Sequence, residues 1–247
     1  MDLPPSRIAM RPFGHVADLN LDFGDEDRPD LVTRLLAQCG ERRDPAFWWS
    51  QPVSVRTAAL LRLVAATEQA DALFFTARCA QASCGETFEF ELPLHALVGG
   101  ADDAGPIRVP LDGERSVTMR RPTGDDLRRW RAARPASRVE AVRMMLDTLL
   151  LDGQVQPQDE ARLSESITAV DPLVAFTVSC HCPACGAASE VPIDLDAAAL
   201  TRLGARQRAL LREVHCLASH YGWTESQVLA LPPARRTQYL AFIESPS

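Results

Sequence analysis

The sequence predicts an α+β protein built around two cysteine-bearing β-hairpins, with a mainly helical insertion between them and a helical C-terminal region. Five of the seven cysteines fall in two clusters, each flanked by short segments of alternating apolar and polar residues. Such alternation is typical of β-strands, whereas the segments between and after the clusters carry apolar residues at helical spacing. With 247 residues, 46% of them apolar, the chain is long enough to bury a sizeable core.

These patterns divide the chain into five regions, of which the second and the fourth are expected to join in one core. The regions are a strand and helix region at 1–72, a first cysteine hairpin at 73–98, a β-hairpin with a helical insertion at 106–172, a second cysteine hairpin at 173–196 and C-terminal helices at 197–247. Residues 99–105, GGADDAG, are the best flexible linker in the chain.

The N-terminal region is expected to contain one strand and two helices. Alternation over 15–23 indicates a strand or a hairpin arm, and leucines at helical spacing over 31–36 predict a helix that stops at Gly40. The aromatic run at 47–49 lies in a proline-bounded loop, and we expect at least one of its two tryptophans to be buried rather than to anchor a protein interface. A second helix is predicted over 56–71.

The insertion is expected to begin with two short strands that meet at an Asp112-Gly113 turn. Residues 123–126, TGDD, resemble a helix capping box with Asp in place of the usual Glu or Gln. Apolar residues on one face predict a helix over 138–150, and a further helix is expected over 159–169.

The C-terminal region is expected to be helical throughout. Leucines and valines over 203–221 mark one stripe of a long helix that ends at Gly222. Thr224 and Gln227 form a capping box for a short helix, and Pro233 is well placed at the start of the last one.

Charge and composition exclude several classes of function. Thirty-three acidic against 26 basic residues give a net charge of −7, which opposes general binding to nucleic acids or anionic membranes. All 26 basic residues are arginines, so no lysine is available for a phosphate loop or a Schiff base. No run of about 18 apolar residues predicts a membrane-spanning helix, and the N-terminus lacks a secretory signal, so we expect a cytoplasmic protein without membrane insertion.

One segment departs from the acidic balance. Residues 115–143 hold nine arginines and three acidic residues, a local charge of +6. Such a run can bind an acidic partner or nucleic acid, but it is more often the solvated face of a helix, and we favour the second interpretation.

The two cysteine clusters resemble each other as sequence repeats that end in Cys-Gly. The members are Cys79, Cys84 and Gly85 in the first and Cys180, Cys182, Cys185 and Gly186 in the second. Laid over each other without a gap, the repeats match Cys79 with Cys180 and Cys84 with Cys185. A tight turn of this kind directs backbone N–H groups toward two thiolates, and its glycine permits a positive φ. Two such zinc-knuckle hairpins would form one composite, zinc-ribbon-like core.

We therefore expect one structural zinc ion, held by Cys79 and Cys84 from the first hairpin and by Cys182 and Cys185 from the second. Cys182 and Cys185 have the two-residue spacing that is common in zinc sites, whereas the alternative pair, Cys180 and Cys185, repeats the four-residue spacing of the first cluster. A closed set of four thiolates has no open position for a substrate, so the metal would be structural. The alternative is a set of free thiols in a reducing cytoplasm.

The metal would join distant parts of the chain, because 97 residues lie between Cys84 and Cys182. Closing so long a loop costs entropy, which a metal-binding free energy on the order of 10 kcal/mol can offset.

No other motif predicts catalysis. His215 and His220 lie five residues apart, the wrong step for a metal pair on one helix face, and no nucleophile elbow, phosphate loop or dinucleotide fingerprint occurs. We expect a protein that is not an enzyme and has no small-molecule substrate.

The two knuckles, the helical insertion and the C-terminal block together resemble the baseplate hub assembly chaperone family of T-even-type contractile phages. Related genes also lie in clusters for phage-tail-like contractile injection systems. The resemblance covers most of the chain and is strongest at 73–94, at 119–130 (MRRPTGDDLRRW) and at 174–244. Two features depart from the family pattern: the first knuckle has four residues between its cysteines, and Cys180 adds a third thiol to the second.

The resemblance implies a non-enzymatic factor that helps to assemble the hub and spike of a contractile tail baseplate in the bacterial or host-cell cytoplasm. Its expected partners are hub and spike proteins, and the expected contacts are Trp223, Leu229, Arg236 and Tyr239 of the C-terminal helices. The alternatives are a permanent structural subunit of the same baseplate and a zinc-ribbon regulator or nucleic-acid-binding module, which the net charge opposes.

Overall fold

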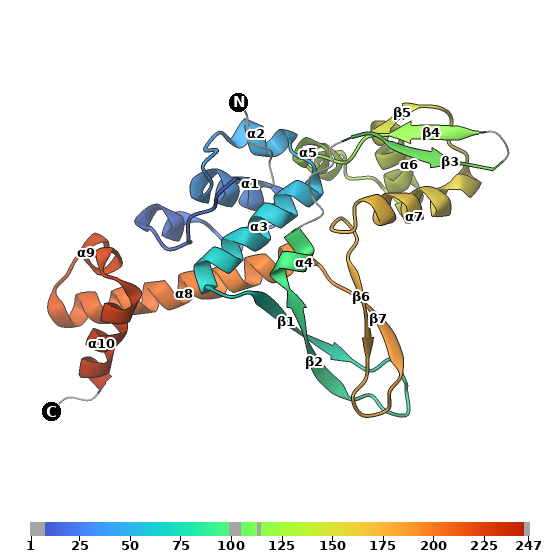
Figure 1. Cartoon of the computed structure of the whole chain (residues 1–247). Helices are drawn as coiled ribbons and strands as arrows, with labels where there is room; N and C mark the ends of the chain where they lie inside the picture. Colours follow the sequence, from blue (N-terminus) through green and yellow to red (C-terminus); the bar gives the residue numbers. More distant parts are fainter. Residues whose placement is uncertain (1–7, 99–104, 113–114, 245–247) are drawn as a thin grey trace.

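A computed structural model of the chain describes residues 8–98, 105–112 and 115–244. It is a mixed α/β structure in which helices predominate and the strands form three small antiparallel sheets. In Figure 1 the two cysteine hairpins extend away from a central helical body, the insertion lies to one side, and the C-terminal helices form an arm. Across the described ranges, the helices are too short or too polar to cross a membrane.

The helical body buries an extensive apolar cluster between four helices. They are α1 (Arg28–Cys39), α2 (Pro45–Ser50), α3 (Val53–Glu68) and the first half of α8 (Leu195–Tyr221). Helix α3 lies against both α1 and α8, and most of its residues are buried, as expected of a helix that is apolar on several faces. The helices predicted over 31–36 and 56–71 are confirmed, and the first ends at Gly40 as expected.

The prediction of a strand after Gly14 is wrong, because Val16–Asn20 form a short 3-10 helix, η2. The buried carboxylate of Asp18 accepts hydrogen bonds of 2.9 Å from the backbone N–H groups of Gly14 and His15. It also accepts bonds of 2.7 Å from two guanidinium nitrogens of Arg11. These bonds close the backbone into a turn, so the alternation of apolar residues does not produce an extended strand.

The aromatic run expected in a loop is instead the helix α2. The Asp44 carboxylate caps this helix by accepting a 2.9 Å hydrogen bond from the backbone N–H of Ala46. Trp48 is fully buried and Trp49 is 9% exposed. The predicted burial of at least one tryptophan is therefore confirmed.

Both cysteine hairpins form as predicted. Strand β1 (Ala72–Arg78) pairs with β2 (Thr87–Pro93), which the short helix α4 (Leu94–Val98) follows, and β6 (Thr177–His181) pairs with β7 (Ala188–Pro192). The hairpins leave the body at separate places and converge, so that their turns meet at the end remote from the body (Figure 1). Within the described strands they form two separate sheets, joined by a small apolar cluster that includes Ala77, Phe88 and Val191.

The insertion folds around a small apolar core of its own. Strands β3 (Ile107–Pro110), β4 (Ser116–Met119) and β5 (Leu150–Asp152) form an antiparallel sheet in that order. The helical elements are α5 (Gly124–Ala133), α6 (Arg138–Leu149), η3 (Pro157–Asp159) and α7 (Glu160–Val170). The predicted strand pair and helices are confirmed, except that Leu150 begins β5 instead of ending a helix.

The insertion is fixed to the body near the start of α5. The capping box of Thr123 and Asp126 is confirmed, and it starts α5 directly beside the body. The backbone N–H of Val53 donates a 2.8 Å hydrogen bond to the carbonyl of Pro122. The expected linker, apart from Gly105, and the glycine of the expected Asp112-Gly113 turn lie outside the described residues.

The C-terminal arm consists of the second half of α8, α9 (Glu225–Ala230) and α10 (Pro233–Glu244). Helix α8 ends at Gly222, whose φ of 68° lies in the left-handed region that favours glycine. The capping box of Thr224 and Gln227 starts α9, and Pro233 starts α10, so all three predictions are confirmed. A separate apolar cluster holds the arm together.

Candidate metal centre

The turns of the two cysteine hairpins bring four thiols together. The Sγ atoms of Cys79, Cys84, Cys182 and Cys185 all lie within 4.8 Å of one another. The Sγ atoms of Cys79 and Cys185 are 3.6 Å apart, and those of Cys84 and Cys182 are 3.8 Å apart. Four sulfurs bound tetrahedrally at about 2.3 Å from a zinc ion would be about 3.8 Å apart. The spacing of this four-thiol cluster therefore fits a tetrahedral metal ion.

The backbone of each turn directs N–H groups toward the sulfurs. The thiol of Cys79 accepts from the N–H of Gln81, and the thiol of Cys84 accepts from that of Glu86. In the second turn the Cys182 sulfur accepts from the N–H groups of Ala184 and Cys185, and the Cys185 sulfur accepts from Ala187. Because these donors also stabilise thiolates, both turns are suited to metal ligation.

A glycine completes each turn in the left-handed region of φ. The φ angle is 60° at Gly85 and 72° at Gly186, values that other residues rarely adopt. The glycines allow the chain to reverse directly after the second cysteine of each turn, so that β2 and β7 can begin two residues after the glycine. The Cys-Gly ending of both repeats is thereby explained.

The strand register corrects the ungapped match of the two repeats. Arg78 faces Thr87 across the first hairpin just as His181 faces Ala188 across the second. The next residue toward the turn is Cys79 in the first hairpin and Cys182 in the second. The first turn is therefore longer by two residues, and Cys182, not Cys180, is the structural counterpart of Cys79.

Cys180 lies apart from the four-thiol cluster. It faces Ser189 within its own hairpin, and its thiol donates to the Ser189 carbonyl at 3.6 Å. It is half-buried in the apolar cluster between the hairpins. The structure thus brings together the four cysteines that the sequence favours and places the alternative ligand elsewhere.

The thiols of the cluster differ in acidity. Burial alone would raise the pKa of Cys182, but backbone N–H groups of Cys185 and Ala184 lower it to about 7. At the other three cysteines, backbone N–H groups act to lower the pKa, yet burial and the neighbouring thiols leave it raised. One thiol can thus ionise near neutral pH, whereas full deprotonation of the cluster requires a cation among the sulfurs.

The cluster is closed on the inside and accessible on one side. Cys79 and Cys182 are 5% and 1% exposed, Cys84 is half-buried and Cys185 is exposed. A metal ion could enter from the side of Cys185, and the four sulfurs would leave it no free coordination position.

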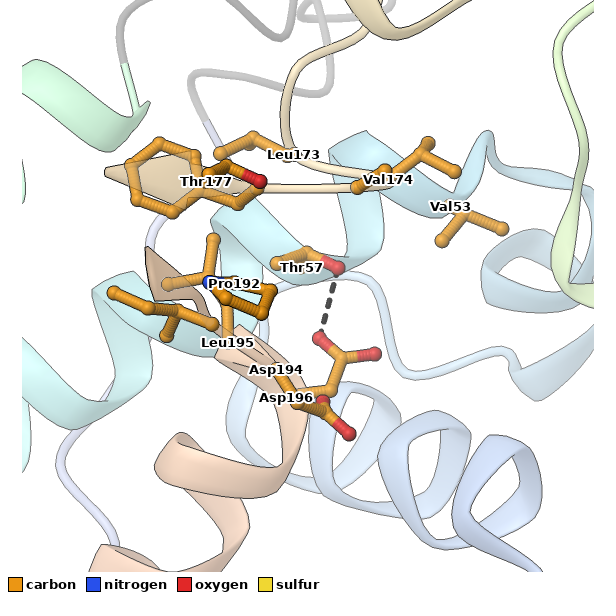
Figure 2. Close-up of a pocket in the computed structure, with 12 residues that line it drawn as sticks. Val53, Thr57, Leu173, Val174, Thr177, Pro192, Asp194, Leu195 and Asp196 are labelled. Atoms are coloured by element: carbon orange, nitrogen blue, oxygen red, sulfur yellow. Dashed lines mark hydrogen bonds between the residues drawn. The ribbon is translucent and has the colours of Figure 1, made fainter. Parts of the chain in front are cut away.

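A cavity of about 510 Å³ lies where the body, the end of the insertion and the second hairpin meet (Figure 2). Two carboxylates line it, and both already have partners. Asp196 accepts a 2.8 Å hydrogen bond from the Thr57 hydroxyl, and Asp194 caps α8 and lies 2.6 Å from Arg28. Burial raises the pKa of Asp196. The twelve residues that line the cavity include no serine, cysteine or histidine, so they offer none of the usual pairs of a nucleophile with an imidazole base.

The four residues expected to contact a partner all lie in or beside the C-terminal arm, but one of them is not accessible. Trp223, Leu229 and Tyr239 are half-buried. Arg236 is 5% exposed, and its guanidinium donates to the Glu213 carboxylate at 2.8 Å and to a backbone carbonyl at 2.7 Å. Arg236 therefore holds α10 against α8 and is not available for a partner.

The sequence analysis missed Phe242, which lies on α10 one turn beyond Tyr239. It is 67% exposed, and its ring centroid is 6.5 Å from that of Tyr239. The Tyr239 ring is in turn 5.0 Å from Trp223, which stacks at 4.7 Å on Tyr221. These four residues form a continuous aromatic cluster at the end of the arm. The three-residue step from Tyr239 to Phe242 is the sequence signal that could have predicted it.

The arginines of the basic run are mostly neutralised within the chain. Seven of the nine between 115 and 143 lie within 4.0 Å of an aspartate, and one of the seven, Arg121, is buried, so the run is not uniformly the solvated face of a helix. Among the residues that the structure describes, the exceptions are Arg134 and Arg138. A run that is internally paired offers few charges to nucleic-acid phosphates.

Comparison of the chain with models of protein families, with curated proteins and with solved structures finds no match.

Proposed function

We propose that the four-thiol cluster binds one structural zinc ion. The observation that carries this proposal is the spacing of the sulfurs, which needs no rearrangement to surround a tetrahedral ion. The ligand set is entirely thiol, which zinc accepts and which magnesium and calcium do not. When bound, the ion would neutralise the thiolates and clamp the two hairpins together.

The test is the metal content of freshly purified, reduced protein. We expect one zinc ion per chain by inductively coupled plasma mass spectrometry, retained through dialysis and released by a thiol-modifying reagent. Protein that refolds from denaturant equally well with and without zinc, and binds none, would refute the proposal.

We further propose that the protein is a non-enzymatic assembly factor for the baseplate hub of a contractile phage tail or a phage-tail-like injection system. The resemblance at 73–94, 119–130 and 174–244 supports this role. A closed thiol cluster suits a structural part rather than a catalyst. The aromatic cluster of the arm is the kind of surface that dominates protein–protein binding energy.

Co-expression with hub and spike proteins of such a particle tests this role. The wild-type chain should co-purify with a hub component, and Phe242→Ser should reduce the recovery, because this exposed ring would be lost without disturbing the core. Gln238→Ala, an exposed change on the same helix, is the matched control. Equal recovery of wild type and Phe242→Ser would remove the arm from the proposed interface.

Quantitative mass spectrometry of finished particles separates an assembly factor from a permanent subunit. An assembly factor should be present during assembly and depleted from purified particles. Stoichiometric presence in the particle would assign the protein to the baseplate itself.

A further inference from the structure

The first cysteine hairpin has one face that packs against the rest of the chain and one that faces solvent. Leu73, Ala77 and Phe88 are buried on the inner face, in the clusters of the body and of the hairpins. Because side chains alternate between the two faces of a strand, the residues between them point outward. The outward residues, all exposed, are Phe74, Thr76 and Arg78 on β1 and Thr87, Glu89 and Glu91 on β2. We call these six residues the outer hairpin face.

The outer hairpin face carries an aromatic ring beside two carboxylates. Phe74 is 61% exposed and lies directly opposite Glu91 in the strand register. Glu89 lies diagonally across from the ring, opposite Thr76. Of the phenylalanine, tyrosine and tryptophan side chains that the structure describes, only those of Phe74 and Phe242 are exposed. A ring beside carboxylates suits a cation, because the ring face and the carboxylates both attract positive charge.

The two carboxylates have no cation of their own. Across the described ranges, neither Glu89 nor Glu91 lies within 4.0 Å of an arginine or a histidine, whereas Glu68 and Glu213 in the helices each pair with an arginine. Both carboxylates are exposed, so a cation from outside the chain can reach them.

The one arginine of this face lies at its other end. Arg78 is four residues from Phe74 along β1, which corresponds to roughly 13 Å. It faces Thr87 next to the turn, and its Nε donates a 3.1 Å hydrogen bond to the carbonyl of Gly85. The part of the outer hairpin face around Phe74 is therefore acidic.

The two carboxylates also have the spacing of an extended chain. Glu89 and Glu91 are two residues apart on β2 and point to the same side, so their positions differ by roughly 7 Å along the strand. A partner segment in an extended conformation repeats its side chains at the same interval. Arginines at every second position of such a segment would therefore face both glutamates at once.

We propose that the outer hairpin face binds an extended, arginine-bearing segment of a partner protein. One guanidinium would stack on Phe74 beside Glu91, and the next would pair with Glu89. The same carboxylates would repel nucleic acids and anionic membranes. A second copy of this chain fits less well, because none of the described strands carries arginines at alternate positions. The proposal depends neither on the zinc ion nor on the baseplate assignment.

The test uses three labelled synthetic peptides of about eight residues, the length of a typical strand. The first alternates threonine with arginine, the second has the same composition with its arginines in adjacent pairs, and the third alternates threonine with glutamate. Binding to the full chain is measured by fluorescence anisotropy at low and at physiological salt. The variants are Phe74→Ser and the double change Glu89→Arg with Glu91→Arg. The matched control is Glu160→Arg with Glu165→Arg, which reverses two exposed charges on α7.

We expect the alternating arginine peptide to bind about threefold more tightly than the paired one, because adjacent arginines point to opposite sides of an extended chain. The glutamate peptide should not bind. Glu89→Arg with Glu91→Arg should lower the affinity at least about tenfold, Phe74→Ser about threefold, and the α7 control less than about twofold.

Three results would overturn the proposal: absence of arginine-peptide binding at low salt, equal binding of the two arginine peptides, or an equal loss of affinity in the two double variants. The last result would show attraction by overall charge and not by this face. A dimer in sedimentation equilibrium that Glu89→Arg with Glu91→Arg dissociates would also overturn it, by assigning the face to a second copy.

Discussion

Replacement of Cys182 by serine is expected to abolish metal binding and to lower the thermal stability of the protein. Cys182 is 1% exposed, and its sulfur lies 3.8 Å from the Cys84 sulfur and accepts two backbone N–H bonds. A serine oxygen at this position is a harder and less acidic ligand than a thiolate, so three sulfurs alone would have to hold the ion. The two hairpins would then keep only their small apolar cluster.

The size of the effect follows from linkage between folding and metal binding. The sulfurs already lie within 4.8 Å of one another, so the folded chain pays little to organise the site, and tight binding is expected. At free zinc about 1,000-fold above the dissociation constant, binding stabilises the native state by about 4.1 kcal/mol. For a chain of this size, each kcal/mol corresponds to about 2–4 °C in Tm, so the expected loss is roughly 8–16 °C.

The assay combines metal analysis with thermal unfolding followed by circular dichroism at a fixed zinc concentration. Hydrogen exchange should increase over 72–93 and 177–192, while α3 stays protected. Cys180→Ser is the control, because its thiol bonds to its own hairpin at 3.6 Å; it should keep the ion and lose less than about 2 °C. A Cys182→Ser protein with one ion per chain and unchanged Tm would refute the ligand set, as would loss of the ion from the control.

Three further predictions concern stability. Arg236→Ala should lower the free energy of unfolding in urea by about 2 kcal/mol, because Glu213 loses a buried charged partner and keeps only a more exposed arginine. Gly124→Ala should lower it by about 1–3 kcal/mol, because the added Cβ would overlap the buried guanidinium of Arg56. Asp126 is buried, which raises its pKa, but hydrogen bonds from an arginine and from the start of α5 hold that pKa below its ordinary value of 3.8. The stabilisation that ionised Asp126 gives the folded state is therefore complete above pH 3.8 and declines as the pH falls toward the lowered pKa. We expect Asp126→Asn to have a lower free energy of unfolding at pH 7 and a weaker loss of stability in acid, measured by urea titrations at several pH values.

Matched variants separate these effects from general disturbance. Arg235→Ala, exposed in the same turn as Arg236, should change the free energy of unfolding by less than about 0.5 kcal/mol. Asp125→Asn, which removes a contact with an exposed arginine, should keep the wild-type pH profile. Wild-type stability of Gly124→Ala would contradict the close approach of α5 to the body.

The elements that the sequence predicted correctly are those whose ends are marked by local chemistry. Gly40 ends α1, Thr123 starts α5 and Thr224 starts α9, and each of these signals acts within a few residues. The four-thiol cluster was also predictable, because Cys-Gly turns occur twice. The preference for Cys182 over Cys180 depended on a common ligand spacing, which the strand register supports.

The features that escaped the sequence analysis depend on partners far along the chain or on competing local bonds. The alternation after Gly14 is that of a strand, but the carboxylate of Asp18 gathers donors that include the side chain of Gln38 and bends the backbone instead. Arginine is common at protein interfaces, so the sequence suggests Arg236 as a contact residue. Only the position of Glu213, 23 residues earlier, shows that the Arg236 guanidinium is paired within the chain. Neither the turn at Asp18 nor the burial of Arg236 can be predicted without knowing which distant side chains contact these two residues.

The described residues form four apolar clusters, of which the three smaller ones lie in the hairpins, the insertion and the arm. A small apolar cluster stabilises its unit only modestly. Each of these three units also contains a polar contact that joins its elements: the four thiols in the hairpins, the ion pair Arg121–Asp171 in the insertion and the ion pair Arg236–Glu213 in the arm. A comparable pair, Arg11–Asp18, lies in the body. Burying such pairs costs desolvation, visible in the raised pKa of Asp171, so they fix geometry more than they add stability. Arginine suits this task because its planar group donates in fixed directions, and the chain has no lysine. These contacts hold each unit together internally, and they leave the exposed ring of Phe242, in the aromatic cluster of the arm, accessible to other proteins.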